Sequence, residues 1–506
     1  MSVADFRGRT TGPADLFLQL WERAVEWSHV QREDALRRPD IVRALMTDLV
    51  MEDDGQVAVD ALIEAIAETL DGSDDRDRGS ILDAMEILDE VFAAVHPRSA
   101  LLAPSRAPRP RSPEWLRDLG EARTLGRPFA QSDTRIVLPR GPFTTTARSQ
   151  ANLNGETLED RFNFLTVAPR FLDVHGRSLP VRSQVVGHEV FTGVPGPGNA
   201  GREAIGVVVV AERADELDIR REEHDGRPFL DIRASETVPA GQRFFDGVQK
   251  LGALDIAMAP ELTMSEVEAL RYADALSKAQ EQKPRLSIAG SGAGRVGDVR
   301  GRFENVSLAF NASGRELWRH SKVWPYAMTP AQVAGFKWDP IDPGQNLAES
   351  LVDGDHFTVA DIDSLGRVIT LICQDFQIKP AVAEAVRLYQ PDWVLVPVLD
   401  SGTDFGRWTH QRAYDLSVES NARYVVASSL ALSDQAEIQG YPDLPVAVLV
   451  GPRGPTPDPD RTYAARAVGI IKCHISEPMC GRLSWGDGSE AWTQTNLARP
   501  KPEPPF

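Results

Sequence analysis

Cys373 is the residue of this sequence best placed to act as a nucleophile. It follows the apolar run 368–372 and precedes Gln374, Asp375 and a stretch of helical character. In an α/β fold, the turn between the carboxyl end of a strand and the next helix is a usual place for a nucleophile. Backbone N–H groups at such a turn favour a thiolate and can hold an oxyanion. The alternative is that Cys373 is a small core residue at the end of a buried strand.

Two further polar residues follow strand-like runs in the same way. Glu261 comes directly after the run 256–260, and Lys322 follows the segment 306–317 and precedes Val323. A buried carboxylate is costly unless it has a partner or a function. A lysine close to a cysteine lowers the pKa of the thiol and can stabilise a developing negative oxygen. Taken singly, Glu261 and Lys322 each fit a solvated residue at the end of a strand better. Together with Cys373 they favour a thiol-based active site.

Other motifs in the sequence do not point to a cofactor or a metal. Residues 292–297 match G-x-G-x-x-G, but the next segment lacks apolar helical periodicity, so we expect a hairpin loop instead of a dinucleotide-binding turn. Cys473, His474 and Cys480 have a spacing that fits no zinc site, and they are better explained as structural residues. No phosphate-binding loop is present. We therefore expect no metal and no organic cofactor.

The elements that must position these residues lie in the second half of the chain. After residue 204, short β-branched runs alternate with helical segments, which predicts an α/β domain over residues 204–485. Before it, apolar residues at helical spacing predict an all-helical N-terminal domain (1–95), followed by a Pro/Arg-rich linker (96–113). Residues 114–203 are a mixed segment to which we assign no role. Residues 486–506 are proline-rich at their end and predict an exposed tail.

Composition narrows the class of protein. The 506 residues include 55 Lys and Arg against 74 Asp and Glu, a net charge of −19, which argues against an extended nucleic-acid-binding surface. Three cysteines are too few for a disulfide scaffold and suit a reducing cytoplasm. No apolar run approaches the ~18 residues of a membrane span, and charged residues occupy the place of a signal peptide's apolar stretch. We therefore expect a cytoplasmic protein that binds neither a membrane nor nucleic acid.

From about residue 204 to 480 the chain resembles the nitrilase superfamily of carbon–nitrogen hydrolases. Four segments in the family's order carry the resemblance: DIAMAPEL (255–262), ENVSLAFNASGRELWRHSKVWP (304–325), LGRVITLICQDFQ (365–377), and PDWVLVPVLDSG (391–402) with ESNARYVVASS (419–429). The resemblance implies a four-layer α-β-β-α sandwich, which in this family commonly assembles into dimers or larger homo-oligomers.

The same resemblance implies a role for each site residue. Cys373 matches the nucleophile, Glu261 the general base and Lys322 the residue that stabilises the oxyanion. Glu349 is the best match to the family's second active-site glutamate, and the backbone N–H of Gln374 is expected to share the oxyanion. The implied chemistry is attack of the thiolate on a carbonyl or nitrile carbon, followed by hydrolysis of a thioester.

The residues after the nucleophile favour an amide-cleaving member of the family. Nitrilases usually have Trp-Glu there, whereas amidases and carbamoylases more often have an aromatic residue followed by Asp or Glu. Asp375 fits the second pattern, and Gln374 fits neither closely. We expect a thiol hydrolase that cleaves a non-peptide amide or N-carbamoyl bond of a small molecule, in preference to a nitrile.

An alternative stays open because the first 200 residues are unlike those of an ordinary single-domain amidase. In that alternative, the nitrilase-like domain is a binding or assembly module of a larger system, for example in antiviral defence, with weak or no hydrolysis. The N-terminal helical domain would then contact a protein partner.

Overall fold

The structure is a computed structural model, and it describes most of the chain. The described residues are 10–26, 53–70, 75–97, 113–141, 158–187, 203–224, 226–280, 283–298, 301–335, 345–362, 365–420, 422–432, 443–452, 466–474, 481–485 and 492–493. Most of the predicted linker (98–112), Cys480 and the end of the predicted tail (494–506) lie outside these ranges.

The N-terminal helices pack with a small sheet into one apolar core. Their bounds are α2 Pro13–Ala24, α4 Gly55–Leu70, α5 Asp75–Val91 and α7 Glu114–Thr124, with the short helices η1 Phe92–Ala94 and η3 Leu158–Arg161. The antiparallel sheet consists of β1 Ala130–Gln131, β2 Arg135–Pro139 and β3 Leu165–Pro169. Leu20 and Trp21 of α2 share a hydrophobic cluster with Phe162 and Val167. The helices predicted over 1–95 therefore share their core with residues of the segment 114–203.

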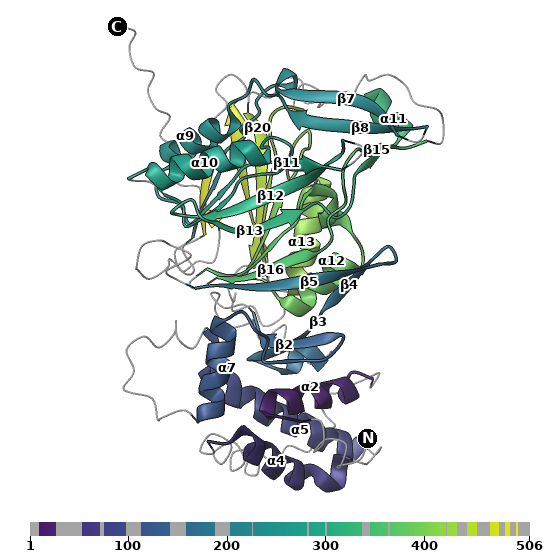
Figure 1. Ribbon diagram of the computed structural model, residues 1–506, viewed down its shortest axis with the longest axis vertical. Helices are drawn as coiled ribbons and strands as arrows, with labels where there is room; N and C mark the ends of the chain where they lie inside the picture. Colours follow the sequence, from purple (N-terminus) through teal and green to yellow (C-terminus); the bar gives the residue numbers. More distant parts are fainter. Residues whose placement is uncertain are drawn as a thin grey trace.

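Two eight-stranded sheets form the centre of the described chain (Figure 1). The first has the order β11-β12-β10-β9-β6-β22-β23, with β13 paired to β12. Its strands are β6 Ala204–Val207, β9 Ile256–Met258, β10 Leu286–Ile288, β11 Gly292–Gly297, β12 Phe303–Asn311, β13 Glu316–Ser321, β22 Gly481–Trp485 and β23 Trp492–Thr493. Strands β6, β9 and β10 run parallel.

The second sheet has the order β21-β20-β19-β18-β17-β16-β5-β4. Its strands are β4 Phe171–Val174, β5 Arg177–Val186, β16 Phe357–Ile362, β17 Gly366–Thr370, β18 Trp393–Pro397, β19 Arg423–Ala427, β20 Asp443–Pro452 and β21 Arg466–His474. Strands β17, β18 and β19 run parallel, so their carboxyl ends meet at one edge of the sheet.

Apolar side chains hold the two sheets and their helices together. One cluster joins the first sheet, through residues such as Ile256 and Ile288, to Val368 and Leu395 of the second. A second cluster packs α9 Ala240–Leu251 and α10 Glu266–Lys278 on the first sheet. A third packs α12 Ala381–Tyr389 and α13 Trp408–Ser420 on the second sheet. The mixed α/β fold predicted from the sequence is confirmed.

Two strands place the boundaries of the α/β part differently from the prediction. Strand β5 pairs in parallel with β16 over residues 181–186, so the second sheet begins well before residue 204. Strand β23 pairs with β22 beyond residue 485. Residues 177–186 of β5 show no regular alternation of apolar and polar residues, and most of their side chains are only partly buried. The segment 114–203 thus supplies strands to both the N-terminal core and the second sheet.

A small third sheet lies at the end of the molecule opposite the N-terminal helices (Figure 1). Its order is β14-β15-β8-β7, with β7 Leu217–His224, β8 Arg227–Ala234, β14 Ala327–Met328 and β15 Leu347–Glu349. The short helix η4 Ala214–Glu216 directly precedes β7, and α11 Pro330–Gly335 lies between β14 and β15 in sequence. Strand β8 pairs in parallel with β15 and thereby fixes the backbone that carries Glu349.

Candidate active site

Cys373 lies at a strained turn at the carboxyl edge of the second sheet. It is the first residue of the short helix η5 Cys373–Gln377, three residues after β17 ends at Thr370. Its φ is 46°, a left-handed conformation that side chains other than glycine rarely adopt. Strain of this kind persists only where surrounding contacts impose it, and it is common at functional sites. Leu262, which follows Glu261, has a φ of 57°.

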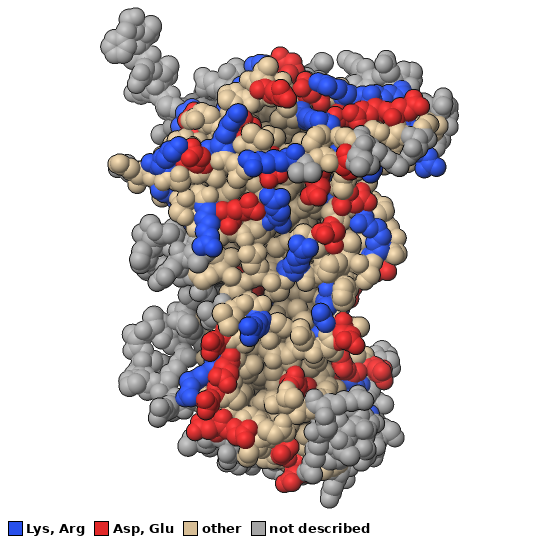
Figure 2. Space-filling model, in the orientation of Figure 1, with Lys and Arg blue, Asp and Glu red and all other residues tan. Residues whose placement is uncertain are grey.

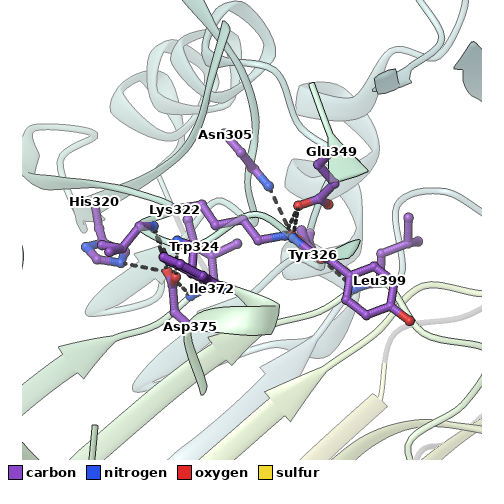
Figure 3. A network of polar contacts seen from close by, with 11 residues as sticks. Asn305, His320, Lys322, Trp324, Tyr326, Glu349, Ile372, Asp375 and Leu399 are labelled. Carbon is purple, nitrogen blue, oxygen red and sulfur yellow. Dashed lines mark hydrogen bonds and ion pairs between the residues drawn. The ribbon is translucent and has the colours of Figure 1, made fainter. Parts of the chain in front are cut away.

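Asp375 supplies the contacts that hold this turn in place. Its buried carboxylate accepts hydrogen bonds from the backbone N–H groups of Val323 (3.0 Å) and Trp324 (2.8 Å), and from that of Ile372 (3.3 Å). His320 lies on the same side, with Nε2 3.5 Å from the carboxylate (Figure 3). One carboxylate therefore ties the nucleophile turn to the segment that carries Lys322.

Lys322 bridges two carboxylates in the interior. Its Nζ lies 2.8 Å from Oε1 of Glu261 and 2.6 Å from Oε2 of Glu349, and the Lys322 side chain is fully buried. Figure 3 shows the lysine extending from the Asp375 side of the network to Glu349. An ammonium has three donors, so two of them are occupied by these carboxylates.

Backbone and amide donors fix both glutamates. Oε1 of Glu261 also accepts from Nδ2 of Asn305 at 3.0 Å, and Oε2 accepts from the N–H of Leu399 at 2.9 Å. Oε2 of Glu349 accepts from the N–H of Tyr326 at 2.8 Å. The N–H of Glu261 donates to the carbonyl of Val398 at 3.3 Å, which joins the carboxyl ends of the two sheets. Each carboxylate is therefore held from two sides.

The electrostatics of the cluster follow from burial and from these charges. Burial raises the pKa of the Glu261 carboxyl, and the charge of Glu349 adds to this effect against the opposing charge of Lys322. Burial would lower the pKa of Lys322, but the two carboxylates outweigh it and hold that pKa well above its usual range. Burial, with the charge of Glu261, raises the pKa of the Cys373 thiol well above its usual value. The resting site thus holds a neutral thiol beside a carboxylate of increased basicity.

Cys373, Glu261 and Glu349 open onto one pocket of about 580 Å³. Gln374 lines the same pocket, next to Cys373. Most of the other lining residues come from the hairpin β7–β8, from the segment around β14 and α11, and from the loop between β18 and α13: Ile219, Ile232, Tyr326, Ala327, Met328, Gln332, Leu399, Asp400, Ser401, Arg407 and Trp408. Leu262 after β9, Gln377 of η5 and Leu432 after β19 complete the lining. A space of this size accommodates a small organic molecule.

The structure thus brings together all five residues singled out from the sequence. Glu261, Lys322 and Glu349 form one hydrogen-bonded cluster, and Cys373 and Gln374 lie beside it on the pocket wall. Sequence reasoning gave no role to Asn305, Tyr326 or Leu399. Asn305 was within reach, because it lies in the quoted segment 304–325. Tyr326 and Leu399 bind the glutamates through their backbone N–H groups, and a backbone N–H leaves no signal in side-chain identity.

The motifs set aside in the sequence lie elsewhere. Residues 292–297 form strand β11, paired antiparallel with β12, where a loop had been expected; as expected, no helix begins there. Cys473 lies buried in β21. Among the described residues, no group of three or more His, Cys, Asp and Glu side chains is arranged to hold a metal ion. Within the same ranges, no helix combines the length and apolar character needed to cross a membrane.

Comparison with known proteins gave matches among solved structures only. No family model matches the chain, and no curated protein matches its sequence. Nit3 of Saccharomyces cerevisiae, a member of branch 10 of the nitrilase superfamily, aligns with 57% of this chain and 92% of its own, at 12% identity and a TM-score of 0.33.

Two further solved structures give similar values. An amidase variant from Nesterenkonia AN1, also of the nitrilase superfamily, aligns with 57% of this chain and 91% of its own, at 14% identity and a TM-score of 0.31. The NitFhit protein of C. elegans aligns with 59% of this chain and 61% of its own, at 12% identity and a TM-score of 0.31. The solved structures that this chain resembles therefore include members of the nitrilase superfamily.

Proposed function

We propose that this protein is a carbon–nitrogen hydrolase of the nitrilase type that cleaves a non-peptide amide or N-carbamoyl bond through a thioester on Cys373. The observation that carries the proposal is the buried Lys322 ammonium, bridged between Glu261 and Glu349 beside a cysteine that opens onto a pocket. Two sheets joined by one apolar cluster, each with a pair of helices on it, support the four-layer α-β-β-α sandwich implied by the sequence motifs.

The first half of the reaction forms the thioester. Glu261 accepts the proton of the Cys373 thiol, and the sulfur attacks the carbonyl carbon of the substrate. The third donor of Lys322 and the backbone N–H of Gln374 then stabilise the negative oxygen. Because the thiol pKa is raised, proton transfer and attack occur together on the bound substrate, and no stable thiolate accumulates.

The second half releases the products. Glu261 gives its proton to the nitrogen of the leaving amine or ammonia as the C–N bond breaks. It then accepts a proton from a water molecule, whose oxygen attacks the thioester carbon, and it returns that proton to the sulfur as the C–S bond breaks and the acid leaves. Glu349 does not exchange protons in this scheme. Its carboxylate holds the Lys322 ammonium in position through the hydrogen bond from Nζ to Oε2, which is 2.6 Å long.

The bond cleaved is proposed from the residues next to the nucleophile. Asp375 occupies the position that is acidic in the amide-cleaving branches, and here it holds the turn through three backbone N–H groups. A nitrile substrate would require an added water before the same thioester forms, and it is the less favoured choice. The predicted homo-oligomer, the cytoplasmic location and a protein partner of the N-terminal helices stay predictions.

Intact-mass spectrometry of the full chain with a library of amides, N-carbamoyl compounds and nitriles tests the proposal. We expect a substrate-dependent acyl adduct on Cys373 and release of amine or ammonia, and both should be lost in Cys373→Ala. Cys473→Ala is the matched control, because this buried cysteine lies on β21 and does not line the pocket. The absence of any adduct or release across the library would contradict the proposal and favour a binding or assembly module.

A further inference from the structure

The loop between β18 and α13 places an acidic and a basic side chain on the pocket wall. Asp400 and Arg407 both line the pocket, together with Ser401 and Trp408. Nη2 of Arg407 lies 3.1 Å from Oδ1 of Asp400 and 2.9 Å from Oγ of Ser401. Nε1 of Trp408 donates to the other oxygen, Oδ2 of Asp400. The guanidinium is therefore held at a defined place on the wall.

Asp400 and Arg407 differ in how many of their polar atoms are still available to a ligand. Both oxygens of Asp400 already accept from the protein, Oδ1 from Arg407 and Ser401 and Oδ2 from Trp408. Within the described chain, the hydrogen bonds of the Arg407 guanidinium use Nη2 alone, and the side chain is 39% exposed. A guanidinium has five N–H donors in a fixed fork, so Nε and Nη1 can still bind a ligand.

The charges along the pocket make this guanidinium distinctive. Three carboxylates line it, those of Glu261, Glu349 and Asp400. Lys322 is engaged by the first two and is fully buried. Among the described residues that line the pocket, Arg407 is the one positively charged side chain. Away from the oxyanion position beside Lys322, Arg407 is therefore where the described pocket wall offers a positive charge and unused donors to a negative group of a ligand.

Two aliphatic side chains of the β7–β8 hairpin line the same pocket. Ile219 and Ile232 face each other across the β7–β8 hairpin and both line the pocket. With Tyr326, the pair packs against one hydrophobic cluster, and with Leu399 it packs against another. The hairpin therefore closes one side of the pocket with aliphatic side chains, which suit an aliphatic part of a ligand.

We propose that the substrate carries a carboxylate, or another anionic oxygen group, at a distance from the scissile C–N bond, and that Arg407 binds it. An aliphatic section of the same molecule then packs against Ile219 and Ile232. This inference rests on the proposed function and narrows it to anionic amides or N-carbamoyl compounds. Nε and Nη1 lie on different edges of the guanidinium, so each can donate one charge-assisted hydrogen bond to such a group while Nη2 stays on Asp400 and Ser401.

The test compares matched substrates on the full-length protein and on Arg407→Gln. The substrates are linear amides of increasing chain length whose far end is a carboxylate, a phosphate, a neutral carboxamide or an ammonium. We expect the wild type to prefer an anionic end. In Arg407→Gln, KM for that substrate should rise roughly 10- to 100-fold, the effect of losing a charged hydrogen bond, while kcat/KM for the neutral amide changes little. Arg407→Lys should restore part of the loss.

Arg220→Gln is the control, because this side chain on β7 is 70% exposed, pairs with Asp218 and does not line the pocket. It should behave as the wild type with every substrate. Equal activity on anionic and neutral amides, a preference for the ammonium end, or an equal loss on all substrates in Arg407→Gln would overturn the inference and leave the proposed function standing. Failure of the proposed function itself would appear differently, as no turnover and no Cys373 adduct with any member of the series.

Discussion

The buried Lys322 is the residue on which the energetics of the site depend. Two carboxylates in the interior repel each other, and the ammonium between them offsets that repulsion at 2.8 Å and 2.6 Å. Removing one member of a buried ion pair leaves an uncompensated charge and costs about 3–5 kcal/mol. The same ammonium keeps one N–H donor for the reaction. Its contribution to stability and its contribution to turnover must therefore be measured separately.

For Lys322→Met we therefore expect two effects. The kcat should fall at least ~100-fold, because an oxyanion donor contributes roughly 3–4 kcal/mol in the transition state. The midpoint of thermal unfolding should also fall, because Glu261 and Glu349 lose their common partner. Steady-state kinetics and circular dichroism melting measure the two quantities. A folded variant with wild-type kcat would rule out the oxyanion role of Lys322.

The raised pKa of the Cys373 thiol predicts how its reaction with an alkylating reagent depends on pH. Burial and the charge of Glu261 hold its pKa well above the usual value, against the weaker opposing effect of Lys322. At neutral pH, without substrate, Cys373 should therefore react with iodoacetamide more slowly than free cysteine, and the rate should still be rising above pH 9. Peptide mapping of alkylated protein over a pH series measures this. A rate that levels off below pH 8 would mean a resting thiolate and a different first step.

Residue type at the ends of strand-like runs singled out Glu261, Lys322 and Cys373, and the resemblance to the nitrilase superfamily gave each of them a role. Each is a polar or reactive residue at the end of an apolar run, and its position in the sequence already implies the cost of burying it. The Arg407–Asp400 pair was not found, because its residues lie in a loop without periodicity. Only the fold shows that this loop returns to the pocket.

At the scale of elements, α5 and β3 are joined by a single carboxylate. Asp89 of α5 accepts hydrogen bonds from the backbone N–H groups of Asn163 (2.7 Å), Phe164 (3.0 Å) and Leu165 (2.7 Å). Burial nevertheless raises the pKa of Asp89 to about 7, because it outweighs these three donors. A carboxyl whose pKa is higher in the folded state than in the unfolded chain favours folding only while it is protonated.

The stability that Asp89 contributes should therefore be complete below pH 4 and be lost as the pH rises through about 7. The change amounts to a few kcal/mol, since one pKa unit corresponds to about 1.4 kcal/mol. Asp89→Asn cannot ionise, so its free energy of unfolding should lack this contribution to the pH dependence. Urea unfolding of both proteins from pH 4 to 8 measures the difference. Parallel pH profiles for the two proteins would contradict the raised pKa.

The elements themselves were only partly predictable. The parallel strands β17, β18 and β19 read as near-continuous apolar runs, because both faces are buried, and such runs stand out in a sequence. Strand β5 does not stand out, since most of its side chains are only partly buried. The hairpin β7–β8 is highly charged, and Figure 2 shows basic and acidic side chains close together over this end of the molecule. Its apolar pair Ile219 and Ile232 is hidden among those charges.

At the scale of the whole molecule, the N-terminal core is continuous with the α/β part. Oγ1 of Thr166 donates to the carbonyl of Leu388 at 2.8 Å, and the hydroxyl of Tyr389 donates to the carbonyl of Pro169 at 2.6 Å. These bonds join β3 to α12, a helix that packs on the second sheet. The sequence analysis assigned β3 to the mixed segment 114–203 and α12 to the domain 204–485, because contacts between residues more than 200 positions apart leave no local pattern.

Removal of residues 1–113 should therefore harm the protein instead of releasing a separate domain. It would delete α2, α4 and α5 and expose Phe162, Val167 and the other strand-side members of their shared cluster. We expect a lower thermal midpoint, increased binding of an apolar dye, and reduced activity in proportion to the folded fraction. Melting, dye fluorescence and amide turnover measured on the truncated and full-length chains decide this. A truncated protein with unchanged melting, turnover and size would show that the N-terminal core is independent of the catalytic unit, despite the bonds between β3 and α12.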